Sequence, residues 1–389
     1  MTIFVDNVNF TLRVALTYVN TLGFWNNLFI GNDNRVFYCY TAFIFFYFNG
    51  TFTLAQMVDL ILNMGDVVTM TAIATLLLTN FVIAAKFAQL LAKRTAVQKM
   101  VKECDDVLRS QTVLKRRKIV IDCDKETTRF MFIFYSSTII SVILWSLNTE
   151  PNGMPLRAWL PWDITTTPAY EITYALQLSI LWISAIGNIC IDFIMVSLAA
   201  QCKCRLQLLC DALEAVGDDM TATDQQIFSD AQENIVKTRL HTCIREHQSI
   251  LTCARDLENC FSFPVLVQFA VASTTLCVIL YQMVFEANTL MAAVGMFIYL
   301  NVIIQQVFYY CYYGNELLIQ SLKVADSVYQ FPWYQCSAPV RRSLLTIVVR
   351  ARNAAYISGG GLFDLSLATF VSIVKCAYSF FTVLSRVAD

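Results

Sequence analysis

The sequence predicts an all-α integral membrane protein with seven transmembrane helices, a cytosolic N-terminus, an external C-terminus and a cytosolic helical anchor domain. Three observations lead to this prediction. Of the 389 residues, 57% are hydrophobic and only 15% are charged, which is too apolar for one soluble core of this size. Seven stretches approach the roughly 20 apolar residues that a bilayer crossing needs. Basic residues gather in alternate connections between these stretches, as they do in cytosolic loops.

The expected spans run the length of the chain, and the first is the weakest because Asn49 and Gly50 interrupt it. The spans cover residues 35–52, 67–91, 130–147, 172–200, 261–285, 290–313 and 362–384. Residues 1–34 contain no compact apolar run with a small-residue cleavage site after it. We therefore expect them to be a cytosolic segment without a cleaved signal peptide.

The charges of the connections predict the orientation. Residues 92–129 are rich in Lys and Arg, whereas the connection before the second span holds Asp59 and Asp66 and no base. The positive-inside rule makes the basic connection cytosolic and the acidic one external. The mainly acidic residues 148–171 and the turn at Glu286 are expected to be external too. The resulting orientation is opposite to that of G-protein-coupled receptors and disfavours that class.

Helical periodicity continues beyond the spans. Apolar residues recur at helical spacing in residues 92–129 and 201–260, so we expect the spans next to them to extend as cytosolic helices, with a break after Gly217. Residues 314–361 are predicted to form anchor helices, the first continuing from the sixth span until Pro332 ends it. The second anchor helix begins near Val340. Its expected apolar stripe is Leu344, Leu345, Ile347 and Val348.

The polar residues give little sign of enzymatic or metal chemistry. None of the fourteen cysteines falls in an expected external loop, so we expect no structural disulfide. Cys202 and Cys204 have no His or second Cys pair at ligand spacing nearby, which favours free thiols over a metal site. His241 and His247 stand apart from any acidic or cysteine cluster, and no nucleophile motif occurs. We expect no enzyme, no cofactor, no metal and no nucleic-acid partner.

The last span carries many hydroxyl groups. They belong to Ser366, Thr369, Ser372, Ser379, Thr382 and Ser385. A helix that faces only lipid would be mostly Leu, Ile and Val, whereas a helix beside a wet pathway mixes apolar and small polar residues. This pattern favours a pore-lining helix, residues 362–389, over a simple anchor.

A set of fixed spacings runs from the end of the sixth expected span to the end of the seventh. It consists of Tyr313-Gly314-Asn315-Glu316, Ser321, Ala325, Tyr329, Trp333, Gly360, Phe363, Leu365-Ser366-Leu367, Thr369-Phe370, Lys375 and Ala377-Tyr378-Ser379-Phe380-Phe381-Thr382-Val383-Leu384. This set resembles the C-terminal signature of the insect odorant receptor family. The family's usual Pro before the glycines is replaced here by Asn353-Ala354-Ala355-Tyr356.

The resemblance implies a ligand-gated, non-selective cation channel in the plasma membrane of olfactory sensory neuron dendrites. An odour-tuned subunit would assemble with the family's coreceptor in a heterotetramer surrounded by membrane lipid. The coreceptor's linker between spans four and five is much longer, so this chain is identified as a tuning subunit. Subunit anchoring is then assigned to Tyr313, Asn315, Ser321, Tyr329, Trp333, Phe370 and Tyr378.

The resemblance also places a gate at Val383, with Ser379 and Thr382 toward the cytosol and Arg386 and Val387 just outside. A narrow apolar ring can close a pore by dewetting, and the alternative for Val383 is an ordinary packed valine. Arg386 either faces the pathway or reaches lipid phosphate at the interface. For Lys86 and Asp192, which fall inside expected spans, an internal salt bridge or snorkelling is favoured over ion conduction.

A small volatile odorant should bind in the outer half of the bundle, in an apolar pocket with few polar groups. Thr138, Ser141 and Trp145 are spaced three and four residues apart and so share one face of the third span. Plain helix packing is the alternative for each candidate. The further candidates are Met70, Ile73, Tyr174, Gln177, Leu181, Ile279, Met283 and Met291.

Two other functions remain open from the sequence. An insect gustatory receptor has this topology but is expected to lack the Tyr378-Ser379 pair. A membrane transporter would need broken half-helices or an internal repeat, and neither is visible. Ligand-evoked current that reverses near zero and needs no substrate gradient would separate a channel from a transporter.

Overall fold

The structure is a computed structural model that describes residues 9–21, 40, 43, 47, 50–65, 67–147, 154–156, 158–162, 167–217, 228–285 and 289–388. Most of the first expected span lies outside these residues. The described part is almost entirely helical. Its elements are α1 (Phe10–Thr21), α3 (Thr51–Leu62), α4 (Val67–Ala92), α5 (Arg94–Arg109), α6 (Leu114–Leu147), α7 (Ala169–Glu214), η2 (Ala215–Gly217), α8 (Asp230–Phe285), α9 (Leu290–Gln330), η3 (Trp333–Gln335), α10 (Ala338–Ala351), β1 (Ser358–Gly359), β2 (Phe363–Asp364) and α11 (Leu367–Ala388).

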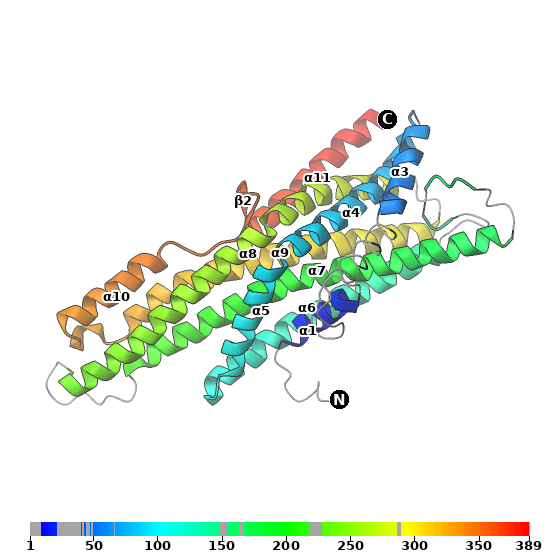
Figure 1. The fold of residues 1–389 in the computed structure, drawn as a ribbon. Helices are drawn as coiled ribbons and strands as arrows, with labels where there is room; N and C mark the ends of the chain where they lie inside the picture. Colours follow the sequence, from blue (N-terminus) through cyan, green and yellow to red (C-terminus); the bar gives the residue numbers. More distant parts are fainter. Residues whose placement is uncertain are drawn as a thin grey trace.

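The long helices α6, α7, α8 and α9 run side by side along the molecule, and α3, α4 and α11 gather near one end (Figure 1). Among the described residues, the helices long and apolar enough to cross a membrane are α4, α6, α7, α8 and α9. Shorter apolar helices are α3 and, over Leu367–Val383, α11. These findings confirm the all-α membrane class, while the number of seven spans and the orientation stay predictions.

The middle of α7 is the centre of the bundle. From Ile189 to Leu206 every residue is buried, and α7 packs against α1, α6, α8 and α9. The surface of this segment is mostly apolar, and its few charged side chains are paired within the bundle. A segment of this kind has to be surrounded by other elements, which explains its central place. Even Arg205 is 1% exposed, because its Nη2 atom pairs with Glu246 at 2.8 Å.

The helices continue well past their apolar stretches. α7 and η2 end at Gly217, where the sequence predicted a break, and α8 runs for 56 residues with Pro264 inside it. α9 continues from its apolar half to Gln330, and α10 follows at the opposite end of the molecule from α3 (Figure 1). The predicted extensions are therefore present in α7, α8 and α9, whereas α4 ends at Ala92 and a separate helix, α5, begins at Arg94.

The buried face of α10 differs from the predicted stripe at one position. Leu344 and Ile347 are buried as predicted, together with Val340 and Ala351. Leu345, in contrast, is 62% exposed. Residues spaced three or four apart share a helix face, and Leu345 lies off the face that these spacings define. Its place in the stripe was wrong.

A short hairpin connects the anchor helices to α11. β1 pairs with β2, and Gly360 and Gly361 turn between them with φ angles of 62° and 70°. Positive φ values are easy for glycine and strained for other residues. The ring of Phe363 in β2 stacks on Phe269 of α8 at 5.4 Å, so the hairpin fixes the start of α11 against the bundle.

Candidate ligand-binding site

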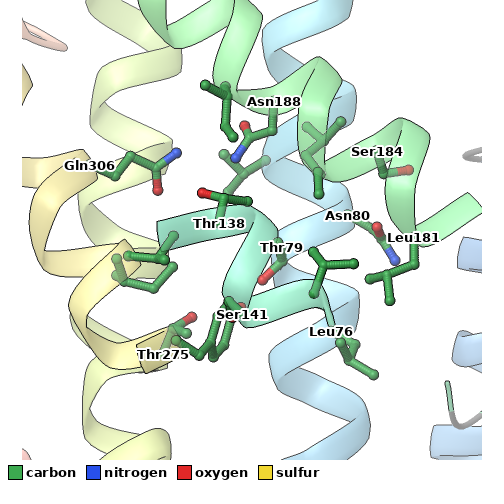
Figure 2. Close-up of a pocket in the computed structure, with 18 of the residues that line it drawn as sticks. Leu76, Thr79, Asn80, Thr138, Ser141, Leu181, Ser184, Asn188, Thr275 and Gln306 are labelled. Atoms are coloured by element: carbon green, nitrogen blue, oxygen red, sulfur yellow. The ribbon is translucent and has the colours of Figure 1, made fainter. Parts of the chain in front are cut away.

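A cavity of about 140 Å³ lies between α4, α6, α7, α8 and α9, with Phe52 of α3 and Leu156 also in its wall. Figure 2 shows labelled residues from these five long helices around the same space. Most of the lining is aliphatic or aromatic. The polar side chains in it are Thr79, Asn80, Thr138, Ser141, Ser184, Asn188, Gln268, Thr275 and Gln306. An apolar space with a few polar groups is typical of sites for small organic ligands.

Four predicted pocket residues line this cavity: Thr138, Ser141, Trp145 and Leu181. The indole of Trp145 donates a hydrogen bond from Nε1 to the Pro155 carbonyl oxygen at 2.9 Å. It also meets the ring of Tyr299 edge to face at 5.9 Å. These two contacts fix the orientation of an aromatic wall of the cavity.

The other predicted pocket residues do not line it. Gln177 is buried behind the wall, where its Oε1 accepts a hydrogen bond from the backbone of Leu156 at 3.0 Å. Tyr174 donates to the Ser146 carbonyl oxygen at 3.4 Å, and Met291 is 51% exposed. Ligand contact by these residues stays a prediction, as it does for Met70, Ile73, Ile279 and Met283.

Several lining residues were not singled out from the sequence. Thr79 and Asn80 come from α4, Ser184 and Asn188 from α7, and Gln306 from α9. Each is a polar residue inside an otherwise apolar helix, which is itself a signal for function. The spacing of Ser184 and Asn188, one turn apart, could have drawn attention to that face of α7.

A buried polar network lies beside the cavity. Lys86 Nζ lies 2.5 Å from Asp192 Oδ1 and donates to Asn188 Oδ1 at 2.9 Å. Asp192 also accepts hydrogen bonds from the Tyr310 hydroxyl and the Gln306 amide. The sequence favoured an internal salt bridge or snorkelling for Lys86 and Asp192, and of these two the structure shows the salt bridge.

Three buried oxygens in cavity-lining side chains have no hydrogen-bond partner among the described residues. They are Thr138 Oγ1, Gln268 Oε1 and Thr275 Oγ1. Leaving a buried polar atom unpaired costs about 1–3 kcal/mol. Atoms of this kind beside a cavity indicate a place where a bound molecule or water supplies the missing hydrogen bond.

The last helix presents several predicted pore residues at its surface. Val383 is 62% exposed in this chain. Ser379 donates to the Lys375 carbonyl oxygen at 2.9 Å, and Thr382 to that of Ser379 at 2.8 Å, so both hydroxyls are bonded within their own helix. The side chains of Arg386 and Val387 lie outside the described residues.

The predicted anchor residues divide into two groups. Tyr313 and Ser321 are buried within the chain, where Ser321 Oγ accepts the Ala355 amide at 3.0 Å. Asn315 is half-buried, and Phe370 meets Phe308 edge to face at 5.6 Å. Tyr329, Trp333 and Tyr378 are exposed in this chain, and their role in subunit contact stays a prediction.

The structure gathers three buried cysteines that the sequence spacing could not connect, because they lie on three helices. Cys104, Cys202 and Cys253 keep their sulfur atoms within 4.8 Å of one another. Hydrogen bonds from Cys202 and then Cys253 lower the pKa of the Cys104 thiol, helped by Arg205. Three thiols and a cation fall short of a four-ligand zinc site. Free thiols remain the prediction.

Comparisons with known proteins identify the family. The family model described as "7tm Odorant receptor" matches residues 66–378. Putative odorant receptor 92a of Drosophila melanogaster is 25% identical over 67% of this chain and 62% of its own length. Odorant receptor Or2 of Anopheles gambiae is 24% identical over 63% of this chain and 64% of its own length. The match thus spans less than two thirds of either relative.

The fold is also shared with a solved structure. The insect olfactory receptor OR5 from Machilis hrabei, in complex with eugenol, superimposes with a TM-score of 0.82 at 15% identity, covering 98% of each chain. The helices and these matches define a multi-pass helical membrane protein of the receptor class. Within that class, the chain belongs to the 7tm odorant receptor family. The relatives are receptors and not enzymes, and the family match favours an odorant receptor over a gustatory receptor.

Proposed function

We propose that this chain is the odour-tuned subunit of a ligand-gated, non-selective cation channel in the plasma membrane of olfactory sensory neurons. The observation that carries the proposal is the cavity between α4, α6, α7, α8 and α9, which is mostly apolar and has a few polar groups on its wall. Such a cavity suits a small volatile molecule. Membership in the odorant receptor family and the eugenol complex of a protein with the same fold support it.

The pore would be shared with other subunits. α11 leaves the side chains of Tyr378, Phe380 and Val383 exposed, at 62%, 55% and 62%. In the heterotetramer with the coreceptor, α11 would line the ion pathway, Val383 would narrow it, and Tyr378 would contact a neighbouring subunit. Tyr329 in the last turn of α9 and Trp333 in η3, both exposed, would contact a neighbouring subunit.

A ligand opens such a channel only if it binds the open state more tightly than the closed one. The cavity and the last helix are joined through α8 and α9. Gln268 of α8 lines the cavity, and its neighbour in the chain, Phe269, stacks on Phe363 just before α11. A rearrangement around the cavity therefore has a short packed route to the pore helix.

Odour-evoked currents from cells that express this chain with its coreceptor test the proposal. Trp145→Ala removes an aromatic wall of the cavity, and burying a large side chain against a ligand is worth about 1.5–3 kcal/mol. We expect the odorant concentration that gives half-maximal current to rise about tenfold or more in this variant. Ile143→Ala, on the exposed side of the same helix, is the control and should leave them unchanged.

The reversal potential distinguishes the alternatives. A non-selective channel gives current that reverses near zero and needs no gradient of the odorant. Current that requires such a gradient would support a transporter. If Trp145→Ala responds to odorants at the same concentrations as the unaltered protein, the cavity is not the odorant site.

A further inference from the structure

The buried carboxylate of Asp192 fixes the direction of a chain of side-chain amides. Its oxygens accept hydrogen bonds from Lys86, Tyr310 and Gln306. An ionised carboxylate only accepts, so Gln306 has to present its NH₂ group to Asp192. Its own Oε1 is then turned away from the carboxylate.

The oxygen of Gln306 in turn determines how the amide of Gln268 is oriented. Gln306 Oε1 accepts a hydrogen bond from Gln268 Nε2 at 2.9 Å. Only the NH₂ end of Gln268 can make this bond, because two amide oxygens facing each other would repel. The order of donors and acceptors along Gln268, Gln306 and Asp192 therefore follows from the charge at its end.

The chain of amides ends in a side chain of the cavity wall. Gln268 lines the cavity, is 4% exposed, and its Oε1 has no partner among the described residues. An amide oxygen accepts hydrogen bonds and cannot donate one. Thr275, seven residues further along the same face of α8, and Thr138 of α6 add unpaired hydroxyls to the cavity wall. These hydroxyls can donate or accept, so among the three unpaired groups Gln268 Oε1 is the one restricted to accepting.

We propose that the ligands preferred by this receptor are small alcohols or phenols, whose hydroxyl group donates a hydrogen bond to Gln268 Oε1. The hydrocarbon part then lies against aliphatic side chains such as Val271, Leu181 and Ile303. Water is the other donor that can reach such an atom. An alcohol replaces the hydrogen bond of a displaced water molecule, whereas an ether or ester of the same size does not.

This inference rests on the proposed function, and pairs of isomers test it separately. Cells expressing the chain and its coreceptor are exposed to hexanol and to its isomer methyl pentyl ether, and to cresol and its isomer anisole. We expect each hydroxyl compound to evoke current at about tenfold lower concentration than its ether isomer, the size expected for one hydrogen bond to a buried acceptor.

Two variants test whether the hydrogen-bonded amides of Gln268 and Gln306 cause the preference for alcohols over ethers. Gln268→Leu removes the acceptor and should raise the half-maximal concentration of the alcohols about tenfold while leaving the ethers unchanged or improved. Gln306→Leu keeps Gln268 but removes the bond that orients it, so the preference for alcohols should shrink. Gln305→Leu, a neighbouring glutamine of α9 that is absent from the cavity wall, is the matched control and should keep the full preference.

The possible outcomes test the preference for alcohols and the channel function separately. If the ethers act on the unaltered protein at the same concentrations as the alcohols, the proposal for alcohols is overturned while the channel stands. An unchanged preference in surface-expressed Gln268→Leu would also overturn it. If no compound of a broad odorant panel evokes current from protein at the cell surface, the channel function itself fails. Should Gln268→Leu not reach the surface, the isomer ratio of the unaltered protein and the Gln306→Leu result still decide.

Discussion

At the residue scale, we expect the buried ion pair between Lys86 and Asp192 to be sensitive to a single change. The side chains are 1% and 4% exposed, and their charged atoms lie 2.5 Å apart. Removing one member of such a pair leaves an unpaired buried charge, which costs about 3–5 kcal/mol. We therefore expect Lys86→Met or Asp192→Leu to lower the melting temperature of the detergent-purified protein markedly.

The double variant Lys86→Met, Asp192→Leu should recover much of this loss, because apolar residues of similar volume often replace a buried pair without penalty. A double-mutant cycle on melting temperatures measures the coupling between the two positions. Lys99→Met is the control, since Lys99 and its partner Glu103 are 63% and 43% exposed and exposed pairs contribute little. Equal losses in Lys86→Met and Lys99→Met would argue against a stabilising role for the buried pair.

At the element scale, the contact between α9 and the segment that leads into α11 depends on one glycine. A Cβ atom on Gly314 would lie 2.4 Å from Leu365 Cβ and 2.6 Å from the Leu365 backbone oxygen. The backbone there cannot move cheaply, so Gly314→Ala should force the two elements apart. We expect a loss of about 1–3 kcal/mol, as for overpacked cores, measured as a lower melting temperature.

Gly295→Ala is the matched control on the same helix. Its Cβ would meet only Leu144 Cβ, at 3.9 Å. Alanine is the better helix former by about 1 kcal/mol, so this variant should be neutral or slightly stabilising. If both alanine variants behaved alike, the close approach of Gly314 to Leu365 would not limit the docking of α11.

Still at this scale, the helices were largely predictable from the sequence, whereas the faces that they bury were less so. Apolar length and helical spacing are local properties, which is why the extent of α7 and the continuation of α9 to Gln330 could be foreseen. Which face meets which neighbour depends on how each helix is rotated in the bundle. The error at Leu345 and the unforeseen meeting of Gln268 with Gln306 both have this cause.

At the scale of the whole molecule, the surroundings of α11 do not follow from its amino-acid composition. Its hydroxyls first indicated a wet surface, yet Ser372, Ser379 and Thr382 are bonded to their own helix backbone. Such bonds are available in lipid as well as beside water. The hydroxyl pattern alone therefore does not distinguish a pore wall from a lipid-facing helix, and the exposed valines of α11 provide a better test.

Val383→Ser is that test. If Val383 forms an apolar constriction in the assembled channel, a serine there lets water remain in the neck and lowers the barrier to ions. We expect cells that express this variant with the coreceptor to carry a resting current several times larger than the unaltered channel without any odorant. Val371→Ser makes the same chemical change at another exposed position of α11 and should leave the resting current unchanged. A valine that faces only lipid would make the two variants equivalent, with closed channels at rest and ordinary odour responses in both.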